Sequence, residues 1–262
     1  MKTITSKDNP KLKAVRALVR SKKDRQEASA FVIEGVRALS ALVDGSALPQ
    51  YRLREIWVSD KVGRDVLSAP RTVGTAVPTY CIAHDVMDQL SDCRTSQGIF
   101  GVVEYTPEPL AINPEQGSYL LVDSLADPGN LGTLIRSAVA FGFAGVFLHG
   151  DTVEVFNPKT VRATMGALPF ARHWKTDETI FQTLEKNGYD LISTVIHGGE
   201  NLQEMKFGLK NVLVIGNEAH GVSEAVQKRA TRQLSIPMSG NVESLNAAVA
   251  GSICMFSMQR KL

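Results

Sequence analysis

Three short stretches in the second half of the chain combine residues that shape the backbone with side chains that could contact a ligand. They are residues 127–136 (DPGNLGTLIR), residues 216–221 (GNEAHG) and residues 236–248 (IPMSGNVESLNAA). Each lies where an apolar, strand-like run gives way to a helical pattern. In open α/β sheets this is the edge at which ligands bind. The three stretches therefore predict a binding site built by three turns of the chain.

The first stretch offers the start of a helix and an arginine. Residues 127–130 have turn chemistry, and helical periodicity runs from Leu131 to Ala140. Backbone N–H groups at such a helix start can hold an anion, and Arg136 could reach toward the same place. Taken alone, the stretch favours a simpler interpretation, in which Asn130 caps the helix and Arg136 forms a surface ion pair. A nicotinamide site fits poorly, because the G-x-G-x-x-G order is absent.

The second stretch follows an apolar run at residues 212–215. Gly216 at its end lets a ligand approach the backbone closely. Glu218 then lies at the carboxyl end of the strand, where an unpaired carboxylate with only a structural role would be costly. The alternative is that Glu218 is stabilised by the dipole of a helix predicted near residues 222–229. His220 is interpreted as a turn residue.

The third stretch is a loop with few charges, ended by Pro237 on one side and by a helix on the other. Such a loop suits adenine or methionine recognition through main-chain groups, and no P-loop occurs in the chain. Ser244 can cap the final helix. Asn246 lies near the start of that otherwise apolar helix, where its amide needs a partner. The alternative is that Asn246 belongs to a capping network.

The charges are concentrated at the N-terminus. Residues 1–25 carry nine lysines and arginines against two acids. This predicts contact with a polyanion, although a solvated helix face has the same composition. The residues expected to make the contact are Lys11, Arg16, Arg20, Lys22, Lys23 and Arg25.

The pattern of the remaining chain predicts two α/β domains. Helices and strands alternate over residues 1–105, and the prolines of residues 106–118 indicate a linker. Residues 119–262 hold repeated apolar runs without alternation, which predicts a mostly parallel sheet covered on both faces. The final helix, residues 244–261, is apolar nearly all round, so it should be buried in the core or against a second subunit.

Several functional classes are disfavoured by composition. No apolar run approaches the roughly 18 residues of a membrane span, and no signal segment opens the chain. Cys81, Cys93 and Cys254 fit neither a disulfide framework nor a zinc site. We therefore expect a soluble cytoplasmic protein with no metal and no membrane partner.

In their order and spacing, the three stretches resemble the signature motifs of the SpoU/TrmH class of S-adenosylmethionine-dependent RNA ribose methyltransferases. The resemblance covers residues 119–262. More loosely, residues 31–35 (FVIEG) and 95–99 (TSQGI) resemble that family's ribosomal-protein-like substrate-binding module. The resemblance to this family implies a deep trefoil knot, an obligate homodimer and the cofactor S-adenosylmethionine. The implied catalytic residues are Asn130, Arg136, Glu218, Ser244 and Asn246, and the implied cofactor-binding residues are Thr194, Gly216, Asn217, Ile236, Met238 and Leu245.

The expected activity is therefore 2′-O-methylation of RNA ribose. A dedicated N-terminal module favours ribosomal RNA over transfer RNA. The competing hypotheses are a non-catalytic RNA-binding or ribosome-assembly protein on the same fold, a related enzyme that methylates a base nitrogen, and a nucleotide-dependent dehydrogenase.

Overall fold

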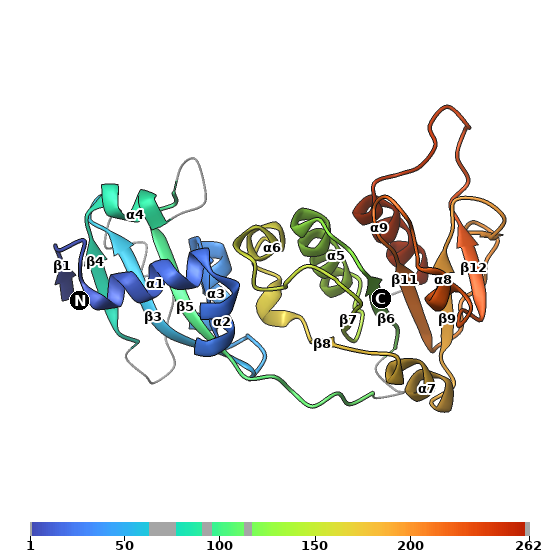
Figure 1. Cartoon of the computed structure of the whole chain (residues 1–262), viewed down its shortest axis with the longest axis horizontal. Coiled ribbons are helices and arrows are strands. Elements are labelled where there is room, and N and C mark those ends of the chain that lie inside the picture. Colours follow the sequence, from blue (N-terminus) through green and yellow to red (C-terminus); the bar gives the residue numbers. More distant parts are fainter. Residues whose placement is uncertain (1, 63–76, 91–95, 113–116, 260–262) are drawn as a thin grey trace. The chain divides into compact units, whose positions relative to one another are not determined.

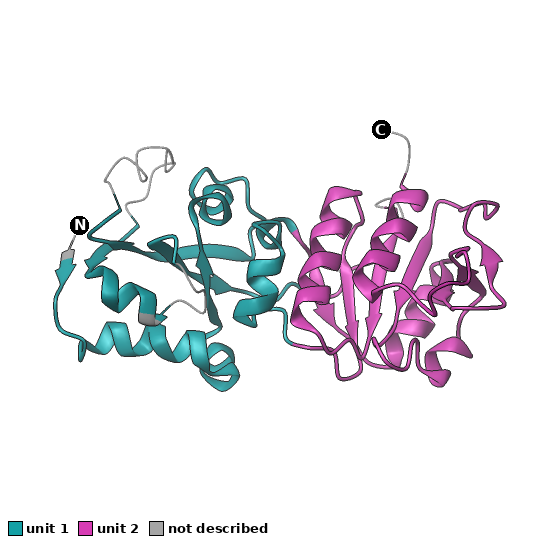
Figure 2. Cartoon of the chain, turned by 90° about the horizontal axis from the view of Figure 1, so that it is seen from above, with its two compact units in different colours: residues 1–108, 154–170 teal, residues 109–153, 171–262 magenta. Residues whose placement is uncertain are grey.

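The chain forms two compact units, which Figure 2 shows in different colours. The computed structural model describes residues 2–62, 77–90, 96–112 and 117–259. The first unit contains residues 1–108 and 154–170, and the second contains residues 109–153 and 171–262. Expectations for Cys93, Thr95, Pro114 and Lys261 fall outside the described residues. No helix in the described part of the chain is long and apolar enough to cross a membrane.

The first unit is built on a five-stranded mixed sheet of order β1-β4-β3-β5-β2, in which β5 runs antiparallel to both neighbours. Its strands are β1 (Lys2–Ile4), β2 (Ala30–Glu34), β3 (Tyr51–Ser59), β4 (Thr79–Ile82) and β5 (Ile99–Tyr105). Its helices are α1 (Pro10–Arg20), α2 (Lys22–Ala28), α3 (Val36–Val43) and α4 (His84–Leu90). The alternation of helices and strands expected for this half is confirmed.

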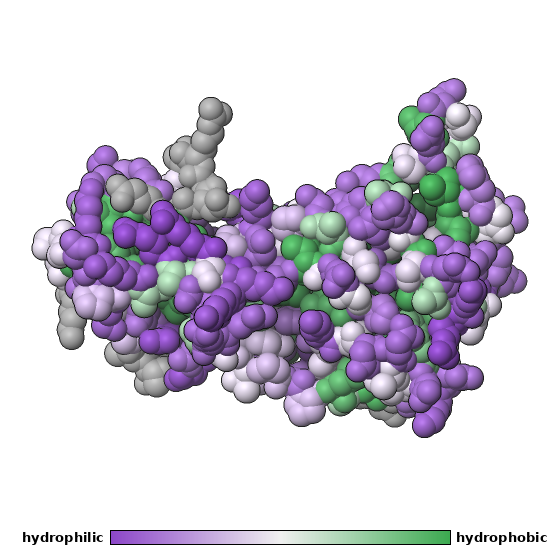
Figure 3. Space-filling view, in the orientation of Figure 1, coloured by the Kyte–Doolittle hydropathy of each residue, from purple (hydrophilic) through white to green (hydrophobic). Residues whose placement is uncertain are grey.

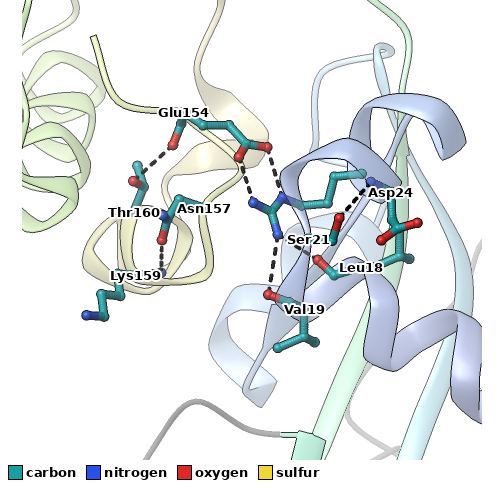
Figure 4. A network of polar contacts seen from close by, with 9 residues as sticks. Leu18, Val19, Ser21, Asp24, Glu154, Asn157, Lys159 and Thr160 are labelled. Carbon is teal, nitrogen blue, oxygen red and sulfur yellow. Dashed lines mark hydrogen bonds and ion pairs between the residues drawn. The ribbon is translucent and has the colours of Figure 1, made fainter. Parts of the chain in front are cut away.

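A segment from the second half of the sequence completes this first unit. It contains α6 (Pro158–Ala163) and the 3₁₀ helix η2 (Leu168–Phe170). The Arg25 guanidinium donates to both carboxylate oxygens of Glu154, at 2.9 and 2.6 Å, and the surrounding contacts are drawn in Figure 4. The ring of Phe156 stacks on that of Phe31, with centroids 4.5 Å apart. The segment is thus fixed by an ion pair and by aromatic packing.

The second unit contains a seven-stranded sheet of order β10-β12-β9-β11-β6-β7-β8. Every neighbouring pair is parallel, which confirms the predicted parallel sheet. Its strands are β6 (Tyr119–Asp123), β7 (Val146–His149), β8 (His173–Lys175), β9 (Asp190–Thr194), β10 (Glu200–Asn201), β11 (Asn211–Ile215) and β12 (Arg232–Ser235). Its helices are α5 (Pro128–Ala140), α7 (Thr179–Lys186), α8 (Glu224–Gln227) and α9 (Ala247–Met258). All residues of β6 and β11 are buried, as expected of central strands covered on both faces.

The final helix lies beside α5 and contacts β11 (Figure 1). The hydroxyls of Ser137 and Ser252 join α5 and α9 at 2.8 Å. A Cβ at Gly251 would overlap the side chain of Leu134, so this glycine permits the close approach. On its other side α9 exposes Val249, Ile253 and Phe256. In a single chain, α9 is therefore buried on one face only.

Candidate active site and cofactor pocket

A cavity of about 580 Å³ opens at the carboxyl ends of β9, β11 and β12. This is the sheet edge at which the sequence predicted a ligand. All six predicted cofactor residues line it: Thr194, Gly216, Asn217, Ile236, Met238 and Leu245. Of the predicted catalytic residues, Glu218 and Ser244 line it as well. Part of the segment between β12 and α9 borders the cavity. This segment is the loop that projects at the upper right of Figure 3, where it shows hydrophobic as well as hydrophilic side chains.

The turn after β11 is locked by its own backbone and by one asparagine. Asn217 and Gly221 exchange two backbone hydrogen bonds, at 2.9 and 2.8 Å. The Asn217 side chain accepts from the Ala219 N–H and donates to the Ser124 carbonyl, at 2.9 and 2.8 Å. A Cβ at Gly216 would overlap the backbone of Gly221. The backbone around Gly216 is therefore rigid where it borders the cavity.

The carboxylate of Glu218 holds the loop that precedes α5. It accepts from the backbone N–H groups of Ala126 and Asp127, at 3.1 and 3.0 Å, and from the Asn130 side chain at 2.9 Å. Partial burial raises the pKa of this carboxyl, but the hydrogen bonds together outweigh burial and lower the pKa. Glu218 is thus an ionised anchor next to the start of α5, where the helix dipole also favours a negative charge.

One chain of hydrogen bonds joins all three sequence stretches. Glu218 accepts from the Asn130 amide, and the Asn130 side-chain oxygen accepts from the Asn246 amide at 2.9 Å. The Asn246 side-chain oxygen in turn accepts from the backbone N–H groups of Ala248 and Val249, at 2.9 and 3.2 Å. The polar group predicted to need a partner therefore has one from another stretch.

Two capping assignments made from the sequence are wrong. Asp127, not Asn130, caps α5, because its carboxylate accepts the Asn130 N–H at 2.7 Å. Asn246, not Ser244, caps α9, so that helix begins at Ala247. Asp127 followed by Pro128 is a regular helix-start signature, and this signal could have identified the first cap.

Arg136 does not line the cavity of its own chain. It is exposed on α5 and, within the described ranges, its guanidinium has no hydrogen bond or ion pair. Among the described residues that line the cavity there is no lysine or arginine. In a single chain, the predicted cofactor pocket and the predicted catalytic arginine are therefore separate.

The predicted polyanion-binding residues differ in their availability. Arg25 is buried. Its guanidinium donates to the carboxylate of Glu154 and, at 2.8 Å, to the carbonyl of Leu18. We therefore exclude Arg25 from a surface contact, contrary to the expectation from composition. The ammonium groups of Lys11 and Lys23 pair with Glu55 and Glu27, at 3.3 and 3.7 Å. In the part of the chain that the structure describes, no ion pair engages Arg16, Arg20 or Lys22.

Comparison with known proteins places the two units in context. The model of the SpoU rRNA Methylase family matches residues 117–256, and that of the MRM3-like substrate binding domain matches residues 9–101. The 23S rRNA (guanosine(2553)-2′-O)-methyltransferase RlmP of Bacillus subtilis is 30% identical, over 99% of this chain and 100% of that protein.

Solved structures agree with these sequence matches. The crystal structure of an rRNA methyltransferase from Sinorhizobium meliloti superposes with a TM-score of 0.85 at 30% identity, covering 98% of this chain and 96% of that one. The SpoU methyltransferase AviRb from Streptomyces viridochromogenes, in complex with the cofactor AdoMet, has a TM-score of 0.84 at 26% identity. That match covers 95% of this chain and 97% of AviRb.

Proposed function

Because the chain belongs to the SpoU rRNA methylase family, we propose that it transfers a methyl group from S-adenosylmethionine to a ribose 2′-hydroxyl of ribosomal RNA. The observation that carries this proposal is the hydrogen-bond chain from Glu218 through Asn130 to Asn246, beside a cavity lined by all six expected cofactor residues. A ribosomal RNA substrate also supports the expected location in the cytoplasm.

The cavity fits the cofactor in size and in chemistry. Its volume of about 580 Å³ lies within the usual range for small-molecule sites. Of the residues that the structure describes, Glu218 and Glu243 line the cavity and no lysine or arginine does, which suits a cationic sulfonium. The rigid backbone at Gly216, with the backbones of Ile236 and Leu245, would hold the adenosine and methionine parts, and the loop after Thr194 would close over them. When bound, S-adenosylmethionine supplies an activated methyl group.

The residues of the chain then have to align the ribose and stabilise charge on its oxygen. Holding two reactants in line can contribute about 7–11 kcal/mol. Arg136 is assigned to grip the adjacent phosphate and to stabilise the developing alkoxide, because an arginine stays protonated and is a poor base. Glu218, Asn130 and Asn246 position the loops around the nucleotide, and Ser244 contacts the nucleotide at the cavity wall.

We propose that Arg136 acts in a homodimer. It lies on α5, next to α9, whose exposed residues Val249, Ile253 and Phe256 form an apolar face. A second copy of the chain would cover this face, since apolar side chains exposed together favour burial against a partner. The same contact would bring Arg136 to the cavity of the partner subunit, which supplies the cation that each cavity lacks.

The proposed path of the chain includes the trefoil knot of the family. The support is the return of the chain after β12, which pairs with β9 and β10, to α9, which packs against α5 and β11. Residues 236–246 make this return.

The proposed function is tested by incubating the purified protein with 23S rRNA, with tRNA and with S-adenosylmethionine labelled in the methyl group. We expect label in ribosomal RNA, and mass spectrometry of the hydrolysed nucleosides should find it on ribose. Label on a base would instead indicate a nitrogen methyltransferase. If calorimetry detects no binding of S-adenosylmethionine, the chain would instead be a non-catalytic RNA-binding protein.

The basic surface of the N-terminal helices gives a separate prediction. Replacing Arg16, Arg20 and Lys22 with glutamine should weaken RNA binding and reduce the slope of log affinity against log salt by about 2, because three phosphate contacts are lost. The matched control replaces Lys7, Lys13 and Lys23, which already pair with Asp85, Asp8 and Glu27. Filter binding across salt concentrations measures both. Equal slopes for the two triple variants would contradict the assignment.

A further inference from the structure

A second cavity, of about 100 Å³, lies wholly within the first unit. Its walls come from the turn between β2 and α3, from the loop before β5, and from α6 with the residues that follow it. We propose that this cavity binds one unstacked base of the RNA substrate, with Arg37 and Arg162 holding the adjoining backbone. The proposal rests on the function proposed above, since it presupposes an RNA substrate.

Two of the walls are fixed to each other by hydrogen bonds. One carboxylate oxygen of Glu34 accepts from the Ser96 hydroxyl at 2.8 Å and from the Gln97 backbone N–H at 3.1 Å. Gly35 has a φ of +101°, and a Cβ there would lie 2.6 Å from the side-chain oxygen of Gln97. The Gln97 amide therefore lies directly over Gly35. It gives the cavity wall a donor and an acceptor, the groups that read the edge of a base.

The third wall is the segment from the second half of the chain that contains α6. The buried ion pair of Arg25 with Glu154 and the stacking of Phe156 on Phe31 fasten this segment. At its far end, a Cβ on Gly166 would lie 3.2 Å from the Cα of Ala38, so α3 and this segment touch through their backbones. The cavity is thus bounded by elements held on several sides.

The side chains of the cavity suit a base attached to a phosphate backbone. Apolar groups of Val32, Ala38 and Val161 line it, and these can contact the faces of a base. Arg37 comes from α3 and Arg162 from α6, so cations stand on two different walls. Guanidinium groups both stack on unpaired bases and grip phosphates.

Arg37 has the freedom that such a contact needs. Its side chain is exposed, and within the described ranges no hydrogen bond or ion pair engages its guanidinium. Among the described residues that line the cavity, Glu34 is the one acid, and it is already engaged by the loop before β5. The volume is below that of ordinary small-molecule pockets, which suits one base of a longer chain better than a free ligand.

The test compares Arg37→Ala and Gln97→Ala with the control Arg54→Ala, which removes an exposed arginine of the same unit that does not line the cavity. For Arg37→Ala we expect the KM for ribosomal RNA to rise about tenfold or more, as for loss of a charged contact. The kcat and the affinity for S-adenosylmethionine should stay unchanged, because Arg37 belongs to the first unit and the residues that line the cofactor cavity belong to the second. Gln97→Ala should raise the KM less. Thermal unfolding verifies that the variants fold.

Cross-linking locates the contact directly. Ribosomal RNA containing 4-thiouridine is irradiated with the wild-type protein, and mass spectrometry maps the linked peptides. We expect links in peptides containing residues 34–38 or 158–166. If the wild type is active but Arg37→Ala and Arg54→Ala have the same KM, this inference is overturned and the proposed function stands. Cross-links confined to other peptides would have the same meaning. A wild type that methylates no RNA overturns the function itself.

Discussion

Replacing Arg136 with alanine should lower the rate of methyl transfer by about a hundred- to a thousandfold, the usual effect of removing a group that stabilises transition-state charge. The affinity for S-adenosylmethionine should stay within a few fold of the wild type, since Arg136 does not line the cavity of its own chain. Single-turnover methylation and calorimetry measure the two quantities. Near wild-type rates for Arg136→Ala would remove this residue from the mechanism.

Mixed dimers decide whether Arg136 serves the cavity of its own chain or that of its partner. Chains carrying Arg136→Ala are co-expressed with chains carrying Gly216→Ala. If Arg136 acts across the dimer, each mixed dimer keeps one complete site, and a random mixture should recover about a quarter of the wild-type activity. If Arg136 acts within its own chain, no complete site forms. A monomeric wild type in solution would contradict the dimer altogether.

Gly216→Ala should abolish detectable cofactor binding and lower the thermal stability of the second unit. The added Cβ would overlap the carbonyl carbon of Gly221 and the nitrogen of Val222, both of which are backbone atoms. The turn could yield only by breaking its paired backbone hydrogen bonds between Asn217 and Gly221. Overpacking of this kind costs about 1–3 kcal/mol or more.

Gly208→Ala is the matched control, because a Cβ there meets no atom within 4 Å and the backbone has no positive φ. Calorimetry and thermal unfolding compare the two variants. If Gly216→Ala binds S-adenosylmethionine as tightly as Gly208→Ala does, the turn after β11 is not a wall of the cofactor site.

Central elements of the fold were predictable because burial leaves a local signature. The apolar runs at residues 119–122 and 212–215 coincide with β6 and β11, which are buried on both faces. Short edge strands were not predicted. The sequences of β8 and β10 are His173-Trp174-Lys175 and Glu200-Asn201, which carry no continuous apolar run.

The cavity at the carboxyl ends of the strands was predictable for a topological reason. Parallel strands bring their carboxyl ends to one edge, so Thr194, Gly216 and Ile236 converge although they are distant in sequence. Hydrogen bonds and ion pairs between residues distant in sequence leave no recognisable pattern in the sequence. The burial of Arg25 depends on Glu154, which is 129 residues away, and neither residue has a local pattern that points to the other.

The contribution of residues 154–170 to the first unit limits how such proteins can be cut and recombined. A gene fragment ending at residue 108 would encode the first unit without Glu154 and Phe156. In that fragment the Arg25 guanidinium would lose its counter-ion, and the ring of Phe31 would lose the ring that stacks on it. Exchanging the first unit between homologues therefore requires two separate pieces of sequence.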